Sequence, residues 1–143
     1  MSGILQWRTD QHGVVMEPFV HDARLVEVTY RETTLKIGVG GQCDIMFILE
    51  GVQETNLCVW SGSIISDIII RRLVGLGDGD EEGFDRLWKP LFDRQLFDRD
   101  IRSAAQRITR RNPNSFLFVL ECSYGGTIAC VADKIGVEEQ ELR

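Results

Sequence analysis

The apolar residues of this chain change their spacing twice, and this change limits the possible folds more than any other feature. Apolar and polar residues alternate along residues 24–31, 35–39 and 116–122, which is the period of a half-buried β-strand. Residues 84–111 instead repeat apolar positions every three or four residues, the period of an amphipathic helix. These positions are Phe84, Leu87, Trp88, Leu91, Phe92, Leu96, Ile101, Ala104, Ala105 and Ile108. The sequence therefore predicts a block of strands, then helix, then a second block of strands.

Further apolar runs and one turn complete the predicted strands. The nearly continuous run 44–50 predicts a strand buried on both faces, and residues 57–60 predict a short strand. The β-branched isoleucines of 64–74 favour a strand over a helix. Gly125-Gly126 suits the two positive-φ positions of a tight hairpin turn, so residues 127–133 are expected to pair back on the preceding strand.

The order of these elements predicts an α+β fold. A doubly wound parallel sheet would need strands and helices to alternate, and here they are segregated. The simplest arrangement that buries both apolar stripes is a mainly antiparallel sheet of about six to seven strands, with one or two helices (84–111) packed on one face. The length of 143 residues fits a single domain, 1–143. The pattern does not decide whether 84–111 forms one helix or two.

Composition argues against several classes of function. The net charge of −6 argues against nucleic acid as a partner, because phosphate contacts need clustered positive charge. No apolar run reaches the roughly 18 residues that a membrane helix needs, so no membrane association is predicted. The first ten residues lack the apolar stretch of a signal peptide, and a cytoplasmic location is therefore expected.

The cysteines and histidines supply no recognisable metal or cofactor site. The four cysteines form no CxxC pair and lie among apolar neighbours, so buried, inert thiols are expected. They are Cys43, Cys58, Cys122 and Cys130. His21-Asp22 could begin a metal site, but His12 is the only other histidine, which is too few ligands.

Two loops carry partial binding motifs. Residues 38–41 are rich in glycine like a phosphate loop, but no GK[ST] follows, and a hairpin turn is the favoured interpretation. Residues 78–83 place three carboxylates and a glycine correctly for a calcium-binding loop. Lys89 then occupies the twelfth position, where a glutamate is required. No metal and no cofactor is therefore predicted.

Three carboxylates lie in otherwise apolar strand segments: Asp67, Glu121 and Asp133. Two carboxylates that meet on a sheet face are the raw material of acid–base chemistry, so these residues form one candidate site. Strand alternation equally allows all three to point outward. No GxSxG or similar catalytic motif accompanies them.

The helical segment is basic within an acidic chain. Residues 84–111 contain eight Lys or Arg and four Asp or Glu, a net charge of +4, which leaves −10 for the remainder. Such segregated charge speeds association with a complementary partner, although a solvated helix face also explains it. Arg102, Arg107 and Arg110 are the candidate binding residues, and an acidic protein is the candidate partner.

Three stretches together resemble a known group of proteins. They are His21-Asp22-Ala23-Arg24-Leu25, the stretch Gly62-Ser63-Ile64-Ile65-Ser66-Asp67-Ile68, and residues 118–130 with the turn Ser123-Tyr124-Gly125-Gly126. This arrangement resembles small bacterial α+β proteins of unknown function, some of them grouped with the immunity proteins of polymorphic toxin systems. The resemblance implies a non-catalytic protein that binds another protein, and it carries over no functional residue.

Two hypotheses of function follow. The first is a non-enzymatic protein-binding protein, immunity-like according to the resemblance, that uses its basic helix. The second is a small-ligand-binding protein or a hydrolytic enzyme that uses carboxylates on the sheet face. A homodimer whose sheet edges pair is a third alternative, which the sequence leaves open.

Overall fold

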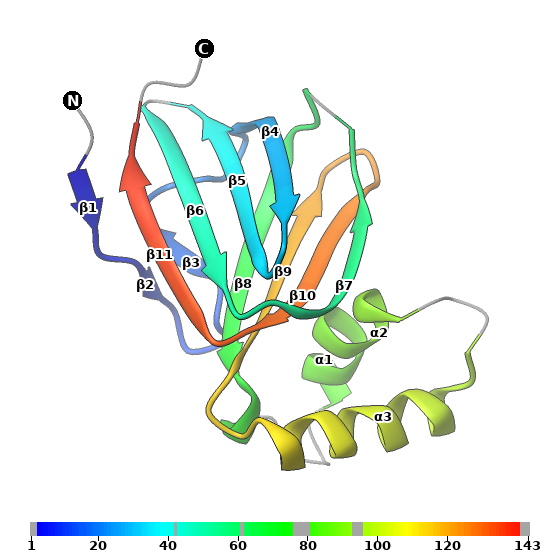
Figure 1. Cartoon of the computed structure of the whole chain (residues 1–143). Coiled ribbons are helices and arrows are strands. Elements are labelled where there is room, and N and C mark those ends of the chain that lie inside the picture. The colour runs from blue at the N-terminus through cyan, green and yellow to red at the C-terminus, as the bar shows by residue number, and fades with distance from the viewer. Residues whose placement is uncertain (1–2, 42, 61, 76–80, 93–95, 141–143) are drawn as a thin grey trace.

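The computed structural model describes residues 3–41, 43–60, 62–75, 81–92 and 96–140 (Figure 1). In these ranges eleven strands form three sheets, and every strand pairing is antiparallel. The orders are β1-β11-β6-β5-β4 in the five-stranded sheet, β7-β10-β9-β8 in the four-stranded sheet, and β2-β3. The strands are β1 (Gly3–Leu5), β2 (Arg8–Thr9), β3 (Val15–Glu17), β4 (Arg24–Arg31), β5 (Thr34–Gly40), β6 (Asp44–Glu50), β7 (Gln53–Cys58), β8 (Ile65–Arg72), β9 (Phe116–Cys122), β10 (Thr127–Ala132) and β11 (Lys134–Glu139).

The mainly antiparallel α+β fold is confirmed, whereas the expected single sheet of six to seven strands is wrong, because the described ranges contain eleven strands in three sheets. Strands β1, β2 and β3 contain only two or three residues, which is too short for alternation to appear. Strand β7 begins at Gln53 rather than at Leu57, because its first half is polar. Strand β11 was missed because Gly136 interrupts its only two apolar residues, Ile135 and Val137.

The five-stranded and four-stranded sheets pack face to face. Alternate residues of each strand point into the layer between them, as the period of two requires. The larger sheet contributes Leu35, Ile37, Val39, Ile45, Phe47 and Leu49, and the smaller sheet Ile65, Ile68, Ile70, Phe118, Leu120, Ile128 and Cys130. Phe47 and Phe118 meet across this layer with their ring centroids 6.0 Å apart.

Helices cover the other face of the four-stranded sheet. Leu117 and Val119 of β9 and Ala129 and Val131 of β10 belong to this second layer. The helices contribute Phe84, Leu87, Trp88, Leu91, Ile101, Ala105 and Ile108. The expected packing of 84–111 on one sheet face is therefore observed, and β9 and β10 are apolar on both faces because both are covered.

The helical segment consists of two parts. The first runs without a break through α1 (Glu81–Gly83), the π-helical turn η2 (Phe84–Trp88) and α2 (Lys89–Leu91), and the second is α3 (Asp98–Arg111). In the π-helical turn the N–H of Lys89 donates to the carbonyl of Phe84, five residues earlier. The wider turn gives room to the ring of Pro90, which has no N–H of its own. None of the helices in the described ranges has the length and hydropathy needed to cross a bilayer.

A β-bulge in β4 corrects one detail of the predicted alternation. Simple alternation places Val26, Val28 and Tyr30 on one face. The register shifts between Leu25 and Glu27, so that Leu25 is buried while Val26 is exposed. The extra residue in the bulge inverts the alternation before Val28, and no sequence pattern marks this position.

The layer between the sheets is expected to dominate stability. Phe118→Ala removes a side chain with no exposed surface, and we expect the free energy of unfolding to fall by about 3–5 kcal/mol. The matched variant Phe97→Ala alters an exposed phenylalanine and is expected to change it by about 0.5 kcal/mol or less. Chemical denaturation measures both, and equal effects of the two variants would contradict the packing described.

Candidate functional site

The helices leave one end of the four-stranded sheet uncovered. The row of residues where the helical cover stops is polar. Each strand contributes one residue to this polar row, in the order Asp67, Glu121, Thr127 and Cys58 across β8, β9, β10 and β7. The next row towards the helices is Ile69, Val119, Ala129 and Asn56. Side chains two apart on a strand share a face, so the polar row lies directly beyond the buried apolar row.

Arg86 of the π-helical turn binds both carboxylates of the polar row. Its Nη2 atom lies 2.8 Å from Oε1 of Glu121 and 3.7 Å from Oδ2 of Asp67. The hydrogen bond with Glu121 raises the pKa of Arg86 above its ordinary value. The structure thus brings two of the three candidate carboxylates together, but one arginine pairs with both of them, which favours an ion-pair role over acid–base chemistry.

The third candidate carboxylate, Asp133, lies elsewhere. It sits in the turn between β10 and β11, beyond the opposite end of β10 from Thr127. The hydroxyl of Ser115 donates to Oδ1 of Asp133 at 2.8 Å, and the Asp133 N–H donates to the carbonyl of Glu50 at 2.9 Å. Asp133 therefore fixes a turn and shares no site with the polar row.

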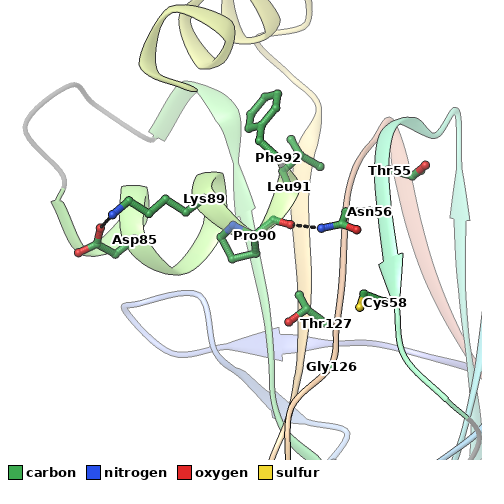
Figure 2. Close-up of a pocket in the computed structure, with 10 residues that line it drawn as sticks. All are labelled: Thr55, Asn56, Cys58, Asp85, Lys89, Pro90, Leu91, Phe92, Gly126 and Thr127. Carbon is green, nitrogen blue, oxygen red and sulfur yellow. Dashed lines mark hydrogen bonds and ion pairs between the residues drawn. The ribbon is translucent and has the colours of Figure 1, made fainter. Parts of the chain in front are cut away.

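A groove of about 830 Å³ extends from the polar row along β7, and we name it the β7 groove (Figure 2). It is lined by Thr55, Asn56, Cys58, Asp85, Lys89, Pro90, Leu91, Phe92, Gly126 and Thr127. The Asn56 side chain donates to the carbonyl of Pro90 at 2.7 Å and joins the strand to the helix. Strand β7 forms one side, and the η2–α2 segment forms the other.

The charges of the β7 groove are balanced within its own wall. Lys89 Nζ lies 3.2 Å from Asp85 Oδ1 and 3.7 Å from Asp98 Oδ1. The hydrogen bond with Asp85 raises the pKa of Lys89 above its ordinary value. Sequence reasoning missed this groove because the polar residues 53–56 gave no strand signal and Lys89 appeared only as one charge of a basic helix.

Three loops at the end of the sandwich nearest the polar row each expose an aromatic side chain. Phe19 follows β3, Trp60 follows β7, and Tyr124 lies in the β9–β10 turn; they are 64%, 60% and 84% exposed. Backbone hydrogen bonds of 2.8 Å tie these loops to one another, from Asp22 N–H to the Ile65 carbonyl and from Ser123 N–H to the Ile64 carbonyl. We name these three residues and their loops the aromatic loop end.

His21 anchors the first of these loops. Its Nδ1–H donates to the carbonyl of Ser66 at 2.5 Å, and its Nε2 lies 3.7 Å from Oδ1 of Asp22. The Ser66 carbonyl, followed by the charge of Asp22, raises the pKa of His21 above its ordinary value. The ring also meets Phe19 edge-on, with centroids 6.4 Å apart. His21-Asp22 is thus a loop anchor, and no three potential metal ligands gather anywhere in the described ranges.

The three candidate arginines of α3 do not form one surface. Arg102 donates to both carboxylate oxygens of Glu81, at 3.0 and 3.1 Å, and its guanidinium lies 3.8 Å from the ring centroid of Phe84. Arg107 and Arg110 are exposed and form no ion pair with a described residue. At 100° per residue Arg102 points about 140° away from Arg107, so Arg102 holds the helical layer together while the other two face outward.

The remaining motifs divide between confirmed and corrected interpretations. Residues 38–41 end β5 in the expected hairpin, whereas residues 78–80 of the acidic loop lie outside the described ranges.

All four cysteines are free, and burial raises the pKa of Cys130 to about 12. The expectation of four buried thiols holds for Cys130 alone, because Cys122 is half-buried and Cys43 and Cys58 are exposed. No protein-family model, curated protein or solved structure matches this chain.

We expect Arg86 to stabilise the fold by pairing with two carboxylates that would otherwise repel each other. Arg86→Met leaves Asp67 and Glu121 unpaired on adjacent strands. Because the arginine side chain is 35% exposed, we expect a loss of about 1–2 kcal/mol in the free energy of unfolding. Adding Asp67→Asn to this variant should recover part of the loss, measured by urea denaturation. No recovery would show that Arg86 acts by packing alone.

We expect the stability of the His21 anchor to depend on pH. The pKa of His21 is raised in the folded state, so the stabilisation is complete below the ordinary histidine pKa. It is lost as the pH rises through the raised value. His21→Gln should abolish this dependence of the melting temperature, while His12→Gln should keep it. An NMR titration that places the His21 pKa at or below its ordinary value would contradict the geometry.

Proposed function

We propose that this chain is a non-enzymatic protein-binding protein that contacts its partner with the aromatic loop end. The observation that carries the proposal is the exposure of Phe19, Trp60 and Tyr124 on three adjoining loops. Large aromatic side chains bury much apolar area on binding, and they supply a large share of the energy at protein interfaces. A partner surface that covers all three explains why each loop carries one.

The order of the loops supports this role. Gly62, Gly125 and Gly126 adopt positive φ values of 86°, 96° and 101°, which fix tight turns that side chains other than glycine rarely allow. Together with the hydrogen bonds from Asp22 and Ser123, these turns hold the loops before a partner arrives. A preorganised surface loses less conformational entropy on binding.

Charge and resemblance favour a protein as the partner. Arg107 and Arg110 on the outer face of α3 attract an acidic protein at long range, which raises the association rate more than the affinity. The resemblance to small bacterial proteins that include toxin-immunity proteins points to the same class of partner. Within this proposal the aromatic residues supply the affinity. The arginines lie on α3, at the other end of the four-stranded sheet (Figure 1), and add only a general long-range attraction that does not orient the partner.

A small-ligand-binding protein is the second candidate, and the β7 groove is the observation that favours it. Its volume of about 830 Å³ lies within the usual range of ligand pockets, and its lining combines polar groups with Pro90, Leu91 and Phe92. A metabolite that raises the melting temperature of the wild-type protein but not of a Thr127→Trp variant would support this candidate. The hydrolytic alternative is weaker because Arg86 binds both carboxylates.

The aromatic loop end is tested by affinity capture from a lysate of the source organism, followed by calorimetry with the purified captured protein. We expect Phe19→Ala/Trp60→Ala/Tyr124→Ala to weaken the binding by about 100-fold or more, since interface aromatics often contribute over 2 kcal/mol each. The control Val74→Ala/Phe97→Ala removes two exposed apolar side chains elsewhere and should bind normally.

The arginines are tested separately by kinetics. Arg107→Glu/Arg110→Glu should slow association, most strongly at low salt, and leave dissociation nearly unchanged. Unchanged affinity of the triple aromatic variant would contradict the proposal. A loss of affinity confined to the arginine variant would move the interface to α3.

A further inference from the structure

The edges of the two large sheets are protected to different degrees. Strand β8 is covered by residues 13–14, through a bridge between Val14 and Ile69 and a 2.8 Å bond from Ile70 N–H to the Gly13 carbonyl. Strand β4 carries a bulge and the charged residues Arg24, Glu27 and Arg31, which discourage pairing. Strand β1 has only three residues. Strand β7 is the remaining edge.

The second half of β7 is suited to pairing with another strand. Residues 55–58 form a regular ladder with β10 on one side, so every second residue directs its N–H and C=O away from the sheet. This segment contains no charged residue, and Thr55, Leu57 and Cys58 are exposed. Glu54 is set apart in a bulge with a φ of 46°. Nothing in residues 55–58 blocks the edge in the way that charges block β4.

The charged residues that line the β7 groove are arranged so that the grooves of two copies can attract each other. Asp85 and Lys89 both line it and lie one helical turn apart. If two copies are related by a two-fold axis perpendicular to the sheet, their η2–α2 segments lie on the same face of the joined sheet and run in opposite directions. The Asp85–Lys89 ion pairs of the two copies then run in opposite directions, so each carboxylate faces the other copy's ammonium, and this arrangement is attractive despite the net charge of −6 on each copy.

We propose that β7 is a docking edge for a second copy of this chain. Residues 55–58 of the two copies pair antiparallel about a two-fold axis, which joins the two four-stranded sheets into one continuous sheet. Pairing satisfies the outward backbone groups of both strands and covers Leu57, which is 40% exposed. The β7 grooves of both copies supply the space in which the two helical walls face one another.

Sedimentation velocity of the full-length protein across the micromolar range tests this dimer. We expect the wild-type protein to form dimers and Leu57→Lys to weaken self-association by about tenfold or more, because two ammonium groups then meet near the axis. Leu57 is partly exposed, so the variant should fold, and circular dichroism melting checks this. Val74→Lys introduces the same charge at an exposed apolar position outside β7, and it serves as the matched control that should still dimerise.

A charge exchange tests the two-fold geometry itself. Asp85→Lys alone puts like charges opposite one another and should weaken the dimer, whereas Asp85→Lys/Lys89→Asp should restore it. A wild-type protein that sediments as a monomer throughout overturns the proposal, as does undiminished dimerisation of Leu57→Lys. Because these variants leave Phe19, Trp60 and Tyr124 unchanged, the outcome is separate from the test of the aromatic loop end.

Discussion

The burial of the four-stranded sheet on both faces is the constraint on which the rest of this structure depends. Strands β9 and β10 stand at its centre and carry apolar residues towards both the five-stranded sheet and the helices. A charged side chain in either layer would lose its hydration without gaining a partner. Charged residues on these strands are therefore confined to rows beyond the edge of one of the two covering layers. The polar row arises at such a limit, because the helices cover fewer rows than the strands provide.

Two arginines join the helical cover to itself and to the sheet. Arg86 reaches down from the π-helical turn to the carboxylates of β8 and β9, and Arg102 joins α3 to Glu81 and Phe84 at the start of the helical segment. Both charged heads are paired, Arg86 with Asp67 and Glu121 and Arg102 with Glu81. The position of the η2–α2 wall, and hence the shape of the β7 groove, depends on these contacts.

The sequence predicted elements whose pattern is local and missed features that depend on register. Alternation located β5 and β9 correctly, and the helical period located the segment 84–111, because each pattern needs only its own residues. The meeting of Asp67 with Glu121 depends on how β8 and β9 align across a long intervening segment, which no local pattern encodes. The pairing of Arg102 with Glu81 was missed for the same reason, since a charge pattern shows which residues are basic and not which of them are already paired.

The helical cover is an insertion between two strands that are themselves neighbours. Arg72 at the end of β8 pairs with Phe116 at the start of β9, so residues 73–115 leave the sheet and return to it at adjacent positions. The entropic cost of bringing the two ends of such an insertion together grows only with the logarithm of its length. This cost therefore changes little when the insertion becomes longer or shorter. The exposed parts of this segment can therefore change in sequence and length while the strands keep their register, provided that its apolar residues still cover β9 and β10. Changes on the outer face of the helical cover therefore leave the pairing of the strands unaltered.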